Sequence, residues 1–427
     1  RHSSGCDRSQ PYEERTVGAL TGETLMLKQM KVLGFTHFVQ GPAASQYLAD
    51  MGADVIKVEP IAGAFERGYG ADEVFVGELS ATFMAVNRNK RSISVDLKSE
   101  QGRKVIESLI RQSDVVIENY RLGVLERLGF GYEAVKKIKP DIIYASASGW
   151  GSSGPKAKAP GQDLLVQARC GLVAVTGNLQ TGPTVPGVPI VDQHAAALLA
   201  MAVNAAYIKK LQTGEGTHIE SNLFSAGLDL QAESMTAYYS GKRTADRMDR
   251  DPRLASWFLP APYGVFKLAD SHAVISLGGD MDKFAEIIGH PGLAELGTDR
   301  MANRDRFMQI LGDELAGWTY ERLDQALSVH GMWYEKVQDY DAIRIDPQAD
   351  QNDCFEEVTI NGAPATLVTH PVSYDGVTPK MRTMPADLGA DTRAVLAEAG
   401  WLDTQIDELL ASGVINDPSR ATQHQRS

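Results

Sequence analysis

Residues 31–59 read KVLGFTHFVQGPAASQYLADMGADVIKVE, and this stretch determines the predicted fold. Apolar residues predict strands at 31–35 and 53–59, and the helix between them begins near Gly41-Pro42 and ends at Gly52. A strand, a helix and a strand within about 30 residues form a βαβ unit. Its strands are therefore expected to be parallel, with a right-handed crossover.

The turn after the first of these strands, THFVQGP at 36–42, contains a single glycine. Turns that bind nicotinamide dinucleotides carry the pattern GxGxxG, because glycines let the pyrophosphate approach the backbone closely. The sequence of this turn therefore argues against a nicotinamide-dependent oxidoreductase.

The alternation of strands and helices continues along the chain. Further apolar strands are predicted at 92–97, 114–118, 141–146 and 218–222, and helices at 99–112, 122–130, 132–138, 190–211 and 223–239. This order predicts an α/β fold with a doubly wound parallel sheet. After the charged stretch 243–253 the pattern changes to two hairpins and short helices, which indicates a smaller α+β domain.

Composition excludes several classes of protein. The 427 residues carry a net charge of −13, which argues against a general nucleic-acid-binding protein. Cys6, Cys170 and Cys354 show no metal-ligand spacing, so no metal site is expected, and their sparse distribution favours a reducing cytoplasm. No apolar run reaches the ~18 residues of a membrane span, and the polar first 25 residues carry no secretory pattern. We therefore expect a cytoplasmic protein without a membrane or nucleic-acid partner.

The stretch 144–194 contains the best candidates for a functional site. It places a Gly149-Trp150-Gly151 corner, a Ser/Gly/Pro/Lys loop, Gln162-Asp163 at a predicted helix start, a second glycine loop at 176–187, and Asp192. Two such loops can hold a substrate against backbone amides and a carboxylate. The alternatives are ordinary surface turns, with Asp163 and Asp192 serving as N-caps of their own helices.

A second candidate is the basic run NRNKR at 87–91, which precedes a predicted strand. Its cations fit either a solvated turn or a phosphate contact. An anionic cofactor on a chain of net charge −13 would need such local cations.

Several motifs together resemble the class III CoA-transferase family, also called the CaiB/BaiF family. They are the 31–59 stretch itself, NRNKRSISVDLK, SDVVIENYRLGVLERLGF, DIIYASASGWGSSGP and PGQDLLVQA followed by GLVAVTG. The resemblance runs from about residue 31 to residue 415 of this sequence. It implies a homodimer of interlocked rings, in which the large domain is built from both chain ends. The implied division is 27–230 and 341–416 for the large domain, 231–340 for the small domain, and tails at 1–26 and 417–427.

The resemblance also implies acyl-CoA and a carboxylic acid as substrates, with no metal. Carried over by position, the residues expected along the coenzyme are His37, Phe38, Val39, Gln40, Pro60, Val95, Lys98, Asn119, Tyr120, Val124, Arg127, Gly149 and Trp150. Lys98 and Arg127 would offset the phosphate charge. A glycine-rich loop at 277–279 would cover the thioester and exclude water.

The family's chemistry uses an aspartate that attacks the thioester to form a mixed anhydride. Counted from Thr176-Gly177, that position holds Gln180, and glutamine cannot form the anhydride. The candidate catalytic residues are therefore Asp163, Gln180 and Asp192. One alternative is an acyl-CoA racemase, isomerase or lyase, although Gln162 stands where that branch has a histidine. A third is a non-catalytic CoA-binding subunit that pairs with a paralogous chain.

Overall fold

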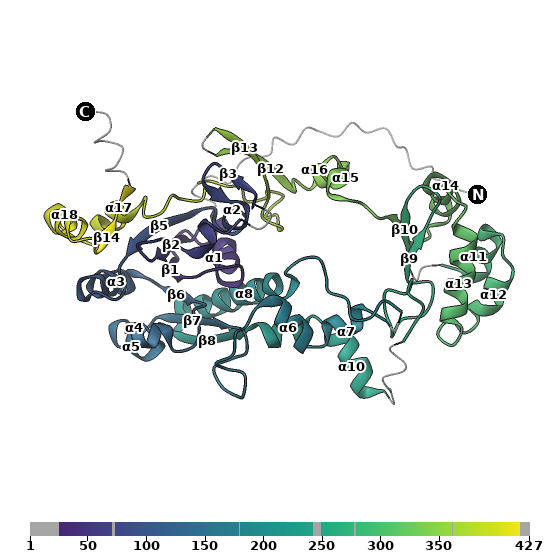
Figure 1. Ribbon diagram of the computed structural model, residues 1–427, viewed down its shortest axis with the longest axis horizontal. Helices are drawn as coiled ribbons and strands as arrows, with labels where there is room; N and C mark the ends of the chain where they lie inside the picture. The colour runs from purple at the N-terminus through teal and green to yellow at the C-terminus, as the bar shows by residue number, and fades with distance from the viewer. Residues whose placement is uncertain are drawn as a thin grey trace, which may run out of the picture.

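The computed structural model describes residues 25–418 apart from 71–72, 179, 242–248, 277–278 and 361. Most of the expected tails at 1–26 and 417–427 lie outside the described residues, as do two residues of the expected glycine-rich loop at 277–279. The large domain, on the left of Figure 1, is built on a seven-stranded sheet. Its strands are β1 (Lys31–Phe35), β2 (Asp54–Glu59), β5 (Lys90–Val95), β6 (Val115–Glu118), β7 (Ile143–Ser148), β8 (Thr217–Asn222) and β14 (Ile415–Asn416).

The order of these strands is β14-β5-β2-β1-β6-β7-β8, and all pairs are parallel except β14 with β5. The chain winds outward from β1 to β5 on one side and from β6 to β8 on the other, as in a doubly wound fold. The predicted parallel sheet is confirmed. The antiparallel edge strand from the C-terminal end was not predicted, because two residues are too few to produce a pattern.

Helices cover both faces of the sheet. On one face, α1 (Gln40–Asp50) and α8 (Ile190–Thr213) pack on apolar strand residues. The other face carries α3 (Glu100–Gln112), α4 (Val124–Leu128), α5 (Tyr132–Ile138), α17 (Thr392–Glu398) and α18 (Asp403–Ala411). Because α17, α18 and β14 follow the small domain in the sequence, both ends of the chain build the large domain.

The small domain has its own core. A three-stranded antiparallel sheet, β9 (Gly264–Lys267), β10 (His272–Ile275) and β11 (Tyr334–Lys336), packs with α11 (Met281–Ile288), α12 (Gly292–Gly297), α13 (Arg304–Leu315) and α14 (Tyr320–Leu327). The first of the two predicted hairpins corresponds to β9 and β10. Strand β11 and helix α12 were not predicted.

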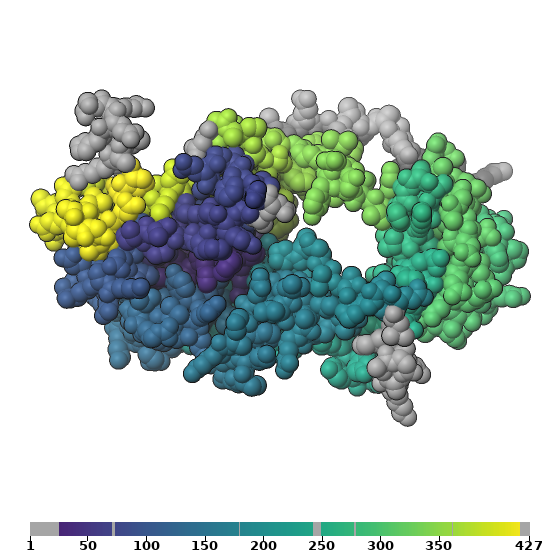
Figure 2. All heavy atoms as spheres, viewed as in Figure 1, coloured from purple at the N-terminus to yellow at the C-terminus, as the bar shows by residue number. Residues whose placement is uncertain are grey.

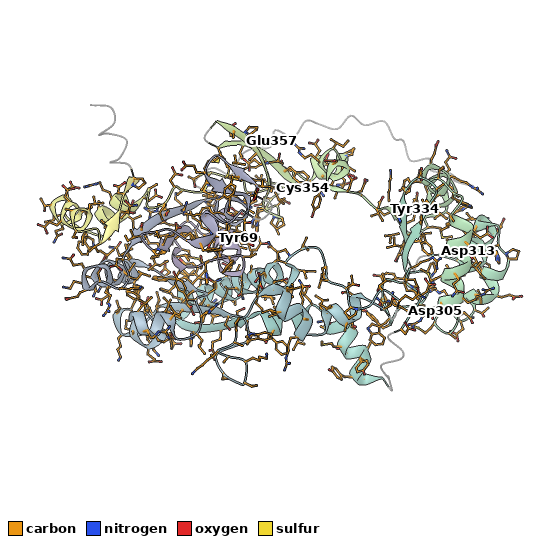
Figure 3. The ribbon with its side chains drawn as sticks, viewed as in Figure 1. Tyr69, Asp305, Asp313, Tyr334, Cys354 and Glu357 are labelled. Atoms are coloured by element: carbon orange, nitrogen blue, oxygen red, sulfur yellow. The ribbon has the colours of Figure 1, made fainter. Side chains whose placement is uncertain are left out.

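Two arms join the two domains and leave an opening between them, which Figure 2 shows in the space-filling view. One arm contains α6 (Asp163–Arg169), α7 (Leu172–Thr176), α9 (Leu223–Asp229) and α10 (Ala232–Ser240); the other contains α15 (Tyr340–Arg344), α16 (Pro347–Gln351) and the hairpin β12 (Phe355–Ile360) with β13 (Ala363–Val368). Tyr69 and Tyr334 lie on opposite sides of the opening (Figure 3).

Remaining elements fasten the second arm to the large domain. The short pair β3 (Phe75–Val76) and β4 (Leu79–Ser80) leads into α2 (Ala81–Asn87). Apolar side chains of β4 and α2 form one cluster with those of β12 and β13. The clustering joins segments about 280 residues apart in the sequence.

The basic run at 87–91 is neither a solvated turn nor a phosphate contact. The Arg88 guanidinium donates to both carboxylate oxygens of Asp50, with Nη2 2.7 Å from Oδ2, and its Nη1 donates to the Val368 carbonyl. The Asn89 side chain accepts from the backbone amides of Arg382 and Thr383. These contacts fasten the returning chain to the end of α1. The cations were misinterpreted because their partners lie far away in sequence.

Candidate functional site

The loops that follow β1 and β6 meet at the point where the winding of the sheet reverses. The His37 amide donates to Asn119 Oδ1 at 2.9 Å, and Asn119 Nδ2 donates to the His37 carbonyl at 2.8 Å. The His37 ring Nε2 lies 2.8 Å from the Asn119 carbonyl oxygen. Open α/β sheets bind ligands in the crevice beside such a reversal point. The structure therefore brings together two residues that were predicted to contact the coenzyme.

The first turn of α1 opens onto this crevice. Phe38 adopts a positive φ of 57°, which is strained for a bulky residue, and its side chain is 48% exposed. Gln40 is buried, and its Nε2 lacks a hydrogen-bond partner among the described residues. At Gly41 a Cβ atom would lie 2.8 Å from the Thr36 methyl carbon and 3.0 Å from Asn119 Cγ, so the close approach of the two loops requires glycine. A helix N-terminus in this position favours an anionic ligand.

Other residues predicted to contact the coenzyme surround the same edge of the sheet. The Tyr120 ring lies 5.2 Å from the His37 ring, centroid to centroid. The side chains of Pro60, Lys98 and Arg127 are exposed, whereas Val39 and Val124 are partly buried. Among them, Lys98 and Arg127 are cations that a phosphate could reach.

Val95 requires a correction. It is 0% exposed and belongs to the core between the sheet and α3. Its backbone pairs with Ile415 of β14, the strand that the sequence did not predict. The side chain of Val95 is therefore closed off from a ligand, contrary to the expectation that it flanks the nucleotide.

Asp163 does not cap its own helix. The N-cap of α6 is Gln162, and Asp163 Oδ1 instead accepts hydrogen bonds at 2.9 Å from the backbone amides of both Val191 and Asp192. Gln167 Nε2 donates to the other carboxylate oxygen. Asp163 is thus an interhelical cap that fixes the first turn of α8. Both of its oxygens have hydrogen-bond donors.

Asp192 lies in that first turn but is not the N-cap, which is Pro189. Burial, together with the negative charge of Asp163, raises the pKa of Asp192 to about 7. His194 points elsewhere, since its Nε2 lies 2.8 Å from Asp229 Oδ2. Two residues apart on the helix, the side chains of Asp192 and His194 diverge. The arrangement resembles the carboxylate pairs in which one acid keeps its proton near neutral pH.

Gln180 lies on the exposed α7–α8 loop. The side chain of Asn178 organises this loop, because its Oδ1 accepts from the Gln180 and Thr181 amides at 2.8 and 3.0 Å. Those two amides are therefore occupied. The neighbouring Leu179 lies outside the described residues.

The corner at Gly149 packs against the same region. A Cβ atom on Gly149 would lie 2.4 Å from the Gly161 Cα atom, so the two glycines allow the chain to pass within contact distance of itself. Trp150 Nε1 donates to the Pro160 carbonyl at 3.0 Å and closes the intervening loop. These contacts bring Gly149 and Trp150 close to the start of α6, where Asp163 lies.

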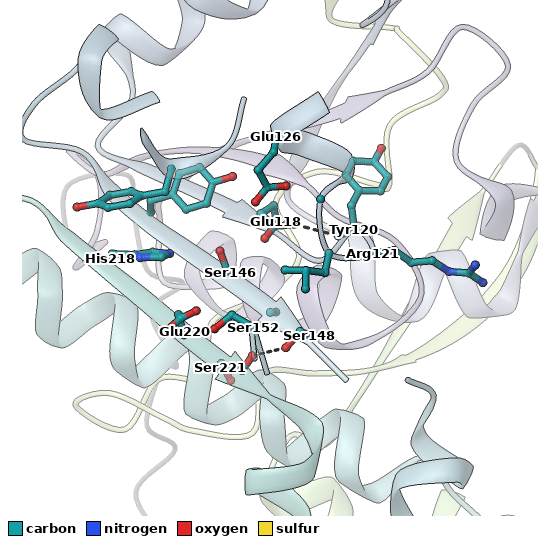
Figure 4. Close-up of a pocket in the computed structure, with 15 residues that line it drawn as sticks. Glu118, Tyr120, Arg121, Glu126, Ser146, Ser148, Ser152, His218, Glu220 and Ser221 are labelled. Carbon is teal, nitrogen blue, oxygen red and sulfur yellow. Dashed lines mark hydrogen bonds between the residues drawn. The ribbon is translucent and has the colours of Figure 1, made fainter. Parts of the chain in front are cut away.

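A pocket beside Tyr120 contains residues that the sequence analysis did not single out. It lies beside the carboxyl end of β6 and along β7 and β8, and it includes Glu118, Glu126, Ser146 and His218 (Figure 4). Burial raises the pKa of Glu118 to about 7, and Glu126 adds to the shift. The available signal was the position of Glu118 at a strand end directly before Asn119. Because Glu118 reads as the last residue of a buried strand, it did not stand out.

Among the described residues, no group of three or more His, Cys, Asp or Glu side chains is arranged to hold a metal ion. No helix in the described part of the chain combines the length and apolar character needed to cross a membrane.

Fold and site together define a doubly wound α/β protein with a crevice at the reversal point of its sheet, a pair of interacting carboxyl groups, and no nicotinamide fingerprint in the turn after β1. Comparison with known proteins identifies the family. Residues 27–392 match the family described as CoA-transferase family III, and the chain belongs to this family. It is a CoA-transferase that exchanges CoA between an acyl-CoA and a carboxylic acid.

Individual relatives agree with this assignment. The chain is 31% identical to the human succinyl-CoA:glutarate CoA-transferase over 401 residues, which cover 91% of this chain and 90% of that one. It is 37% identical to the acetyl-CoA:oxalate CoA-transferase of Acetobacter aceti over 295 residues, covering 67% and 74% of the two chains. A crystal structure of a CaiB/BaiF family protein from Brucella suis aligns with a TM-score of 0.75 at 29% identity, covering 88% and 99%.

Proposed function

We propose that this chain transfers CoA through a covalent intermediate on Asp192. In this scheme the nucleotide of the acyl-CoA lies along the reversal point of the sheet, between the α1 N-terminus and the loop after β6. Lys98 and Arg127 offer cations for its phosphates. The observation that supports the proposal is the carboxylate pair: within the described part of the chain the Asp192 carboxylate has no hydrogen-bond donor, whereas both oxygens of Asp163 accept hydrogen bonds.

The reaction follows from the nucleophile. The Asp192 carboxylate attacks the thioester carbonyl, the C–S bond breaks, and CoA leaves as thiolate, so that the acyl group remains on Asp192 as a mixed anhydride. The thiolate then attacks the aspartyl carbonyl, which releases the donor acid and leaves an aspartyl-CoA thioester. An acceptor carboxylate reverses these two steps and departs as the new acyl-CoA. Gln180 cannot replace the aspartate, because an amide forms no anhydride.

Succinyl-CoA and glutarate are the substrates to test first, because the human relative carries their names. Hydroxylamine added during turnover would convert an aspartyl thioester into a hydroxamate, which peptide mass spectrometry locates. We expect the modification on the peptide that contains Asp192. Turnover with no modified aspartate would contradict covalent transfer.

The racemase or isomerase alternative is less well supported by the site. Proton exchange at the α-carbon needs two bases, and Gln162 is not one, while His194 is engaged with Asp229. Deuterium wash-in from heavy water separates the two chemistries, since transfer between carboxylates leaves the α-proton in place. A chain that neither transfers CoA nor exchanges protons, but binds CoA, would be the non-catalytic subunit.

Replacing Asp163 by Asn tests the carboxylate pair. The Asn oxygen still accepts from the amides of Val191 and Asp192, and Gln167 can turn its amide so that its unpartnered Oε1 accepts from the new Asn amide. The negative charge is lost, so the pKa of Asp192 should fall below about 7 while burial still holds it above the usual value.

Because a nucleophilic carboxylate must be ionised, wild-type activity should rise as the pH increases through about 7. The Asp163→Asn profile should have its midpoint at lower pH and the same plateau. The pH dependence of kcat measures this. Asp163→Ala is the contrasting variant, because it removes the acceptor for both amides and should destabilise the protein. An unshifted Asp163→Asn profile would mean that Asp192 is not the titrating group.

We also propose that two chains form an interlocked homodimer in the cytoplasm. The opening between the domains supports threading by a second chain (Figure 2). Helix α8 carries an exposed apolar stripe, in which Met201, Ile208 and Leu211 are 62%, 55% and 66% exposed, and such an exposed apolar surface is typical of a protein–protein interface. The sparse cysteines of the sequence support the cytoplasmic location.

A charge in that stripe should prevent dimerisation. Met201→Glu would place a carboxylate on the apolar surface of α8, where burial without a partner is unfavourable. We expect the variant to elute as a monomer in size-exclusion chromatography with light scattering, while wild type elutes as a dimer. The matched control is Gln193→Glu, two turns earlier on an exposed polar position of the same helix, which should remain dimeric. A dimeric Met201→Glu protein would place the interface elsewhere.

A further inference from the structure

Arg250 makes an unusual set of contacts with the loop that contains Gln180. Its side chain is buried. Its guanidinium donates four hydrogen bonds to backbone carbonyls. Nη2 lies 2.9 Å from the Val175 oxygen and 3.4 Å from the Thr176 oxygen, and Nη1 lies 3.0 Å from the Gly177 oxygen. The fourth nitrogen contact, from Nε to the Leu254 oxygen, is 2.8 Å long. One planar cation thus joins two segments about 75 residues apart in the sequence.

The first three carbonyls belong to the C-terminal end of α7. The last carbonyls of any helix have no partner within the helix, and a cation is favoured there by the helix dipole. Since α7 has only five residues, it supplies little stability of its own. Arg250 therefore determines where α7 ends and in which direction the chain leaves it.

The chain that leaves α7 is a tight loop. A Cβ atom on Gly177 would lie 1.8 Å from the Gly182 carbonyl oxygen, so the two ends of the loop are in direct contact. Asn178 occupies the loop amides, as described above, and the Thr184 amide donates back to the Val173 carbonyl at 3.1 Å. Arg250 thus binds the Gly177 carbonyl at the start of this loop, Asn178 binds two of its amides, and the chain then leads into α8, whose first turn carries Asp192.

The other side of Arg250 is built into the small domain. Leu254, whose carbonyl it holds, forms an isolated bridge with Gly264 at the start of β9. The Val265 amide donates to the Arg253 carbonyl at 2.9 Å, and Arg304 of α13 donates to the Asp249 carbonyl at 2.7 Å. The segment 249–254 is thus part of the small domain. The hydrogen bonds described above connect it to α7 through Arg250.

We propose that Arg250 is a positioning residue that couples the small domain to the α7–α8 loop and so fixes, during CoA transfer, the segment that leads into the first turn of α8, where Asp192 lies. This inference rests on the proposed function for its effect on catalysis, but not for its effect on the loop. Removing the guanidinium should free the loop without disturbing the crevice after β1 and β6, where the nucleotide is proposed to bind. The consequence is a loss of turnover rather than of affinity for the acyl-CoA.

The test compares Arg250→Met and Arg250→Lys with Arg253→Met. Arg253 is the matched control, because it lies in the same segment and its ion pair is with Asp251, 3.0 Å away, rather than with α7. Amide hydrogen exchange is measured on peptides covering 172–189 and 31–59, and kcat and KM are measured with succinyl-CoA and glutarate. Lysine keeps the charge but, as a point donor, cannot reach all the carbonyls that the planar guanidinium reaches.

In Arg250→Met we expect exchange in 172–189 to become about tenfold faster or more, and that in 31–59 to stay unchanged. The kcat should fall about 100-fold, as for other displaced catalytic loops, with KM for succinyl-CoA within about threefold of wild type. Arg250→Lys should recover only part of the loss. Arg253→Met should match wild type in both measurements.

Three results would overturn the inference: unchanged exchange in 172–189, a rise in KM equal to the fall in kcat, or full recovery by lysine. The readouts also separate the two proposals. If wild type transfers no CoA but the exchange difference is present, the proposed function fails and the anchoring of the loop stands. If wild type is active and exchange is unchanged, the anchoring fails and the proposed function stands.

Discussion

Asp192→Asn is expected to lower the rate of CoA transfer by about 10⁴-fold or more, as removal of a covalent nucleophile does in other enzymes. Asparagine has the same shape, so the first turn of α8 and its cap by Asp163 should persist. What disappears is the carboxylate that accepts the acyl group, since an amide does not attack a thioester to give an anhydride. The variant also lacks the titration of the Asp192 carboxyl group, whose pKa is about 7.

Initial rates with succinyl-CoA and glutarate check this expectation, together with the hydroxamate experiment, which should yield no modified peptide. The matched control is Asp229→Asn, which removes another helix carboxylate near α8, the partner of His194. That variant should keep the wild-type rate within about threefold, because a partly exposed ion pair contributes little. An Asp192→Asn enzyme with normal turnover would refute Asp192 as the nucleophile and leave the reaction to a carboxylate outside this pair.

Asp50→Ala is expected to lower the free energy of unfolding by about 3 to 5 kcal/mol, the usual result of breaking a buried ion pair from one side. The Asp50 side chain is fully buried and accepts from Arg88, Asn89 and His370, and Arg88 is nearly as buried. In the alanine variant the Arg88 guanidinium would stay buried without its main counter-charge, which is unfavourable. The returning segment that Arg88 and Asn89 hold would lose its attachment to α1.

Chemical denaturation monitored by circular dichroism measures the loss. Asp54→Ala is the control, because it breaks the partly exposed pair with Arg91 and should cost about 1 kcal/mol or less. Equal losses for the two variants would mean that burial of the Asp50 pair has no energetic consequence.

The same site predicts an acid sensitivity. Burial would raise the pKa of Asp50, but the hydrogen bonds from His370, Arg88 and Asn89 outweigh it, and the net pKa lies below its usual value. A depressed carboxyl pKa stabilises the fold at pH values above the unfolded-state pKa, and this contribution is lost as the pH falls through the folded-state value. Wild type should therefore lose stability on acidification more steeply than Asp50→Ala.

Local patterns in the sequence were enough to predict most of the large domain. The 31–59 stretch predicted β1, α1 and β2, and the regular alternation predicted the parallel sheet, because each of these elements has its own apolar period. The predicted helix at 223–239 was partly wrong: it is two helices, α9 and α10, separated at Leu230 and Gln231. Residue periodicity continues across such a break and so does not reveal it.

The candidate site was predicted less completely. The pairing of His37 with Asn119 and the approach of Asp163 to Asp192 connect residues 82 and 29 positions apart, and no local pattern encodes either contact. Sequence reasoning could name the four residues but not their partners. Arg250 was overlooked for a related reason: its hydrogen-bond partners are backbone carbonyls, which every residue possesses and which leave no pattern in the sequence.

By itself, the sequence determined which segments are strands and helices, that the sheet is doubly wound, and which residues are chemically able to serve a CoA-transferase. Only the tertiary structure decided that Asp163 caps α8 rather than α6, that Val95 is closed inside the core, and that Arg88 and Asn89 of the basic run make buried contacts with Asp50. The reason is physical: periodicity records what a residue's own element needs, whereas burial, charge pairing and the pKa of a carboxyl group depend on neighbours that folding brings from elsewhere in the chain.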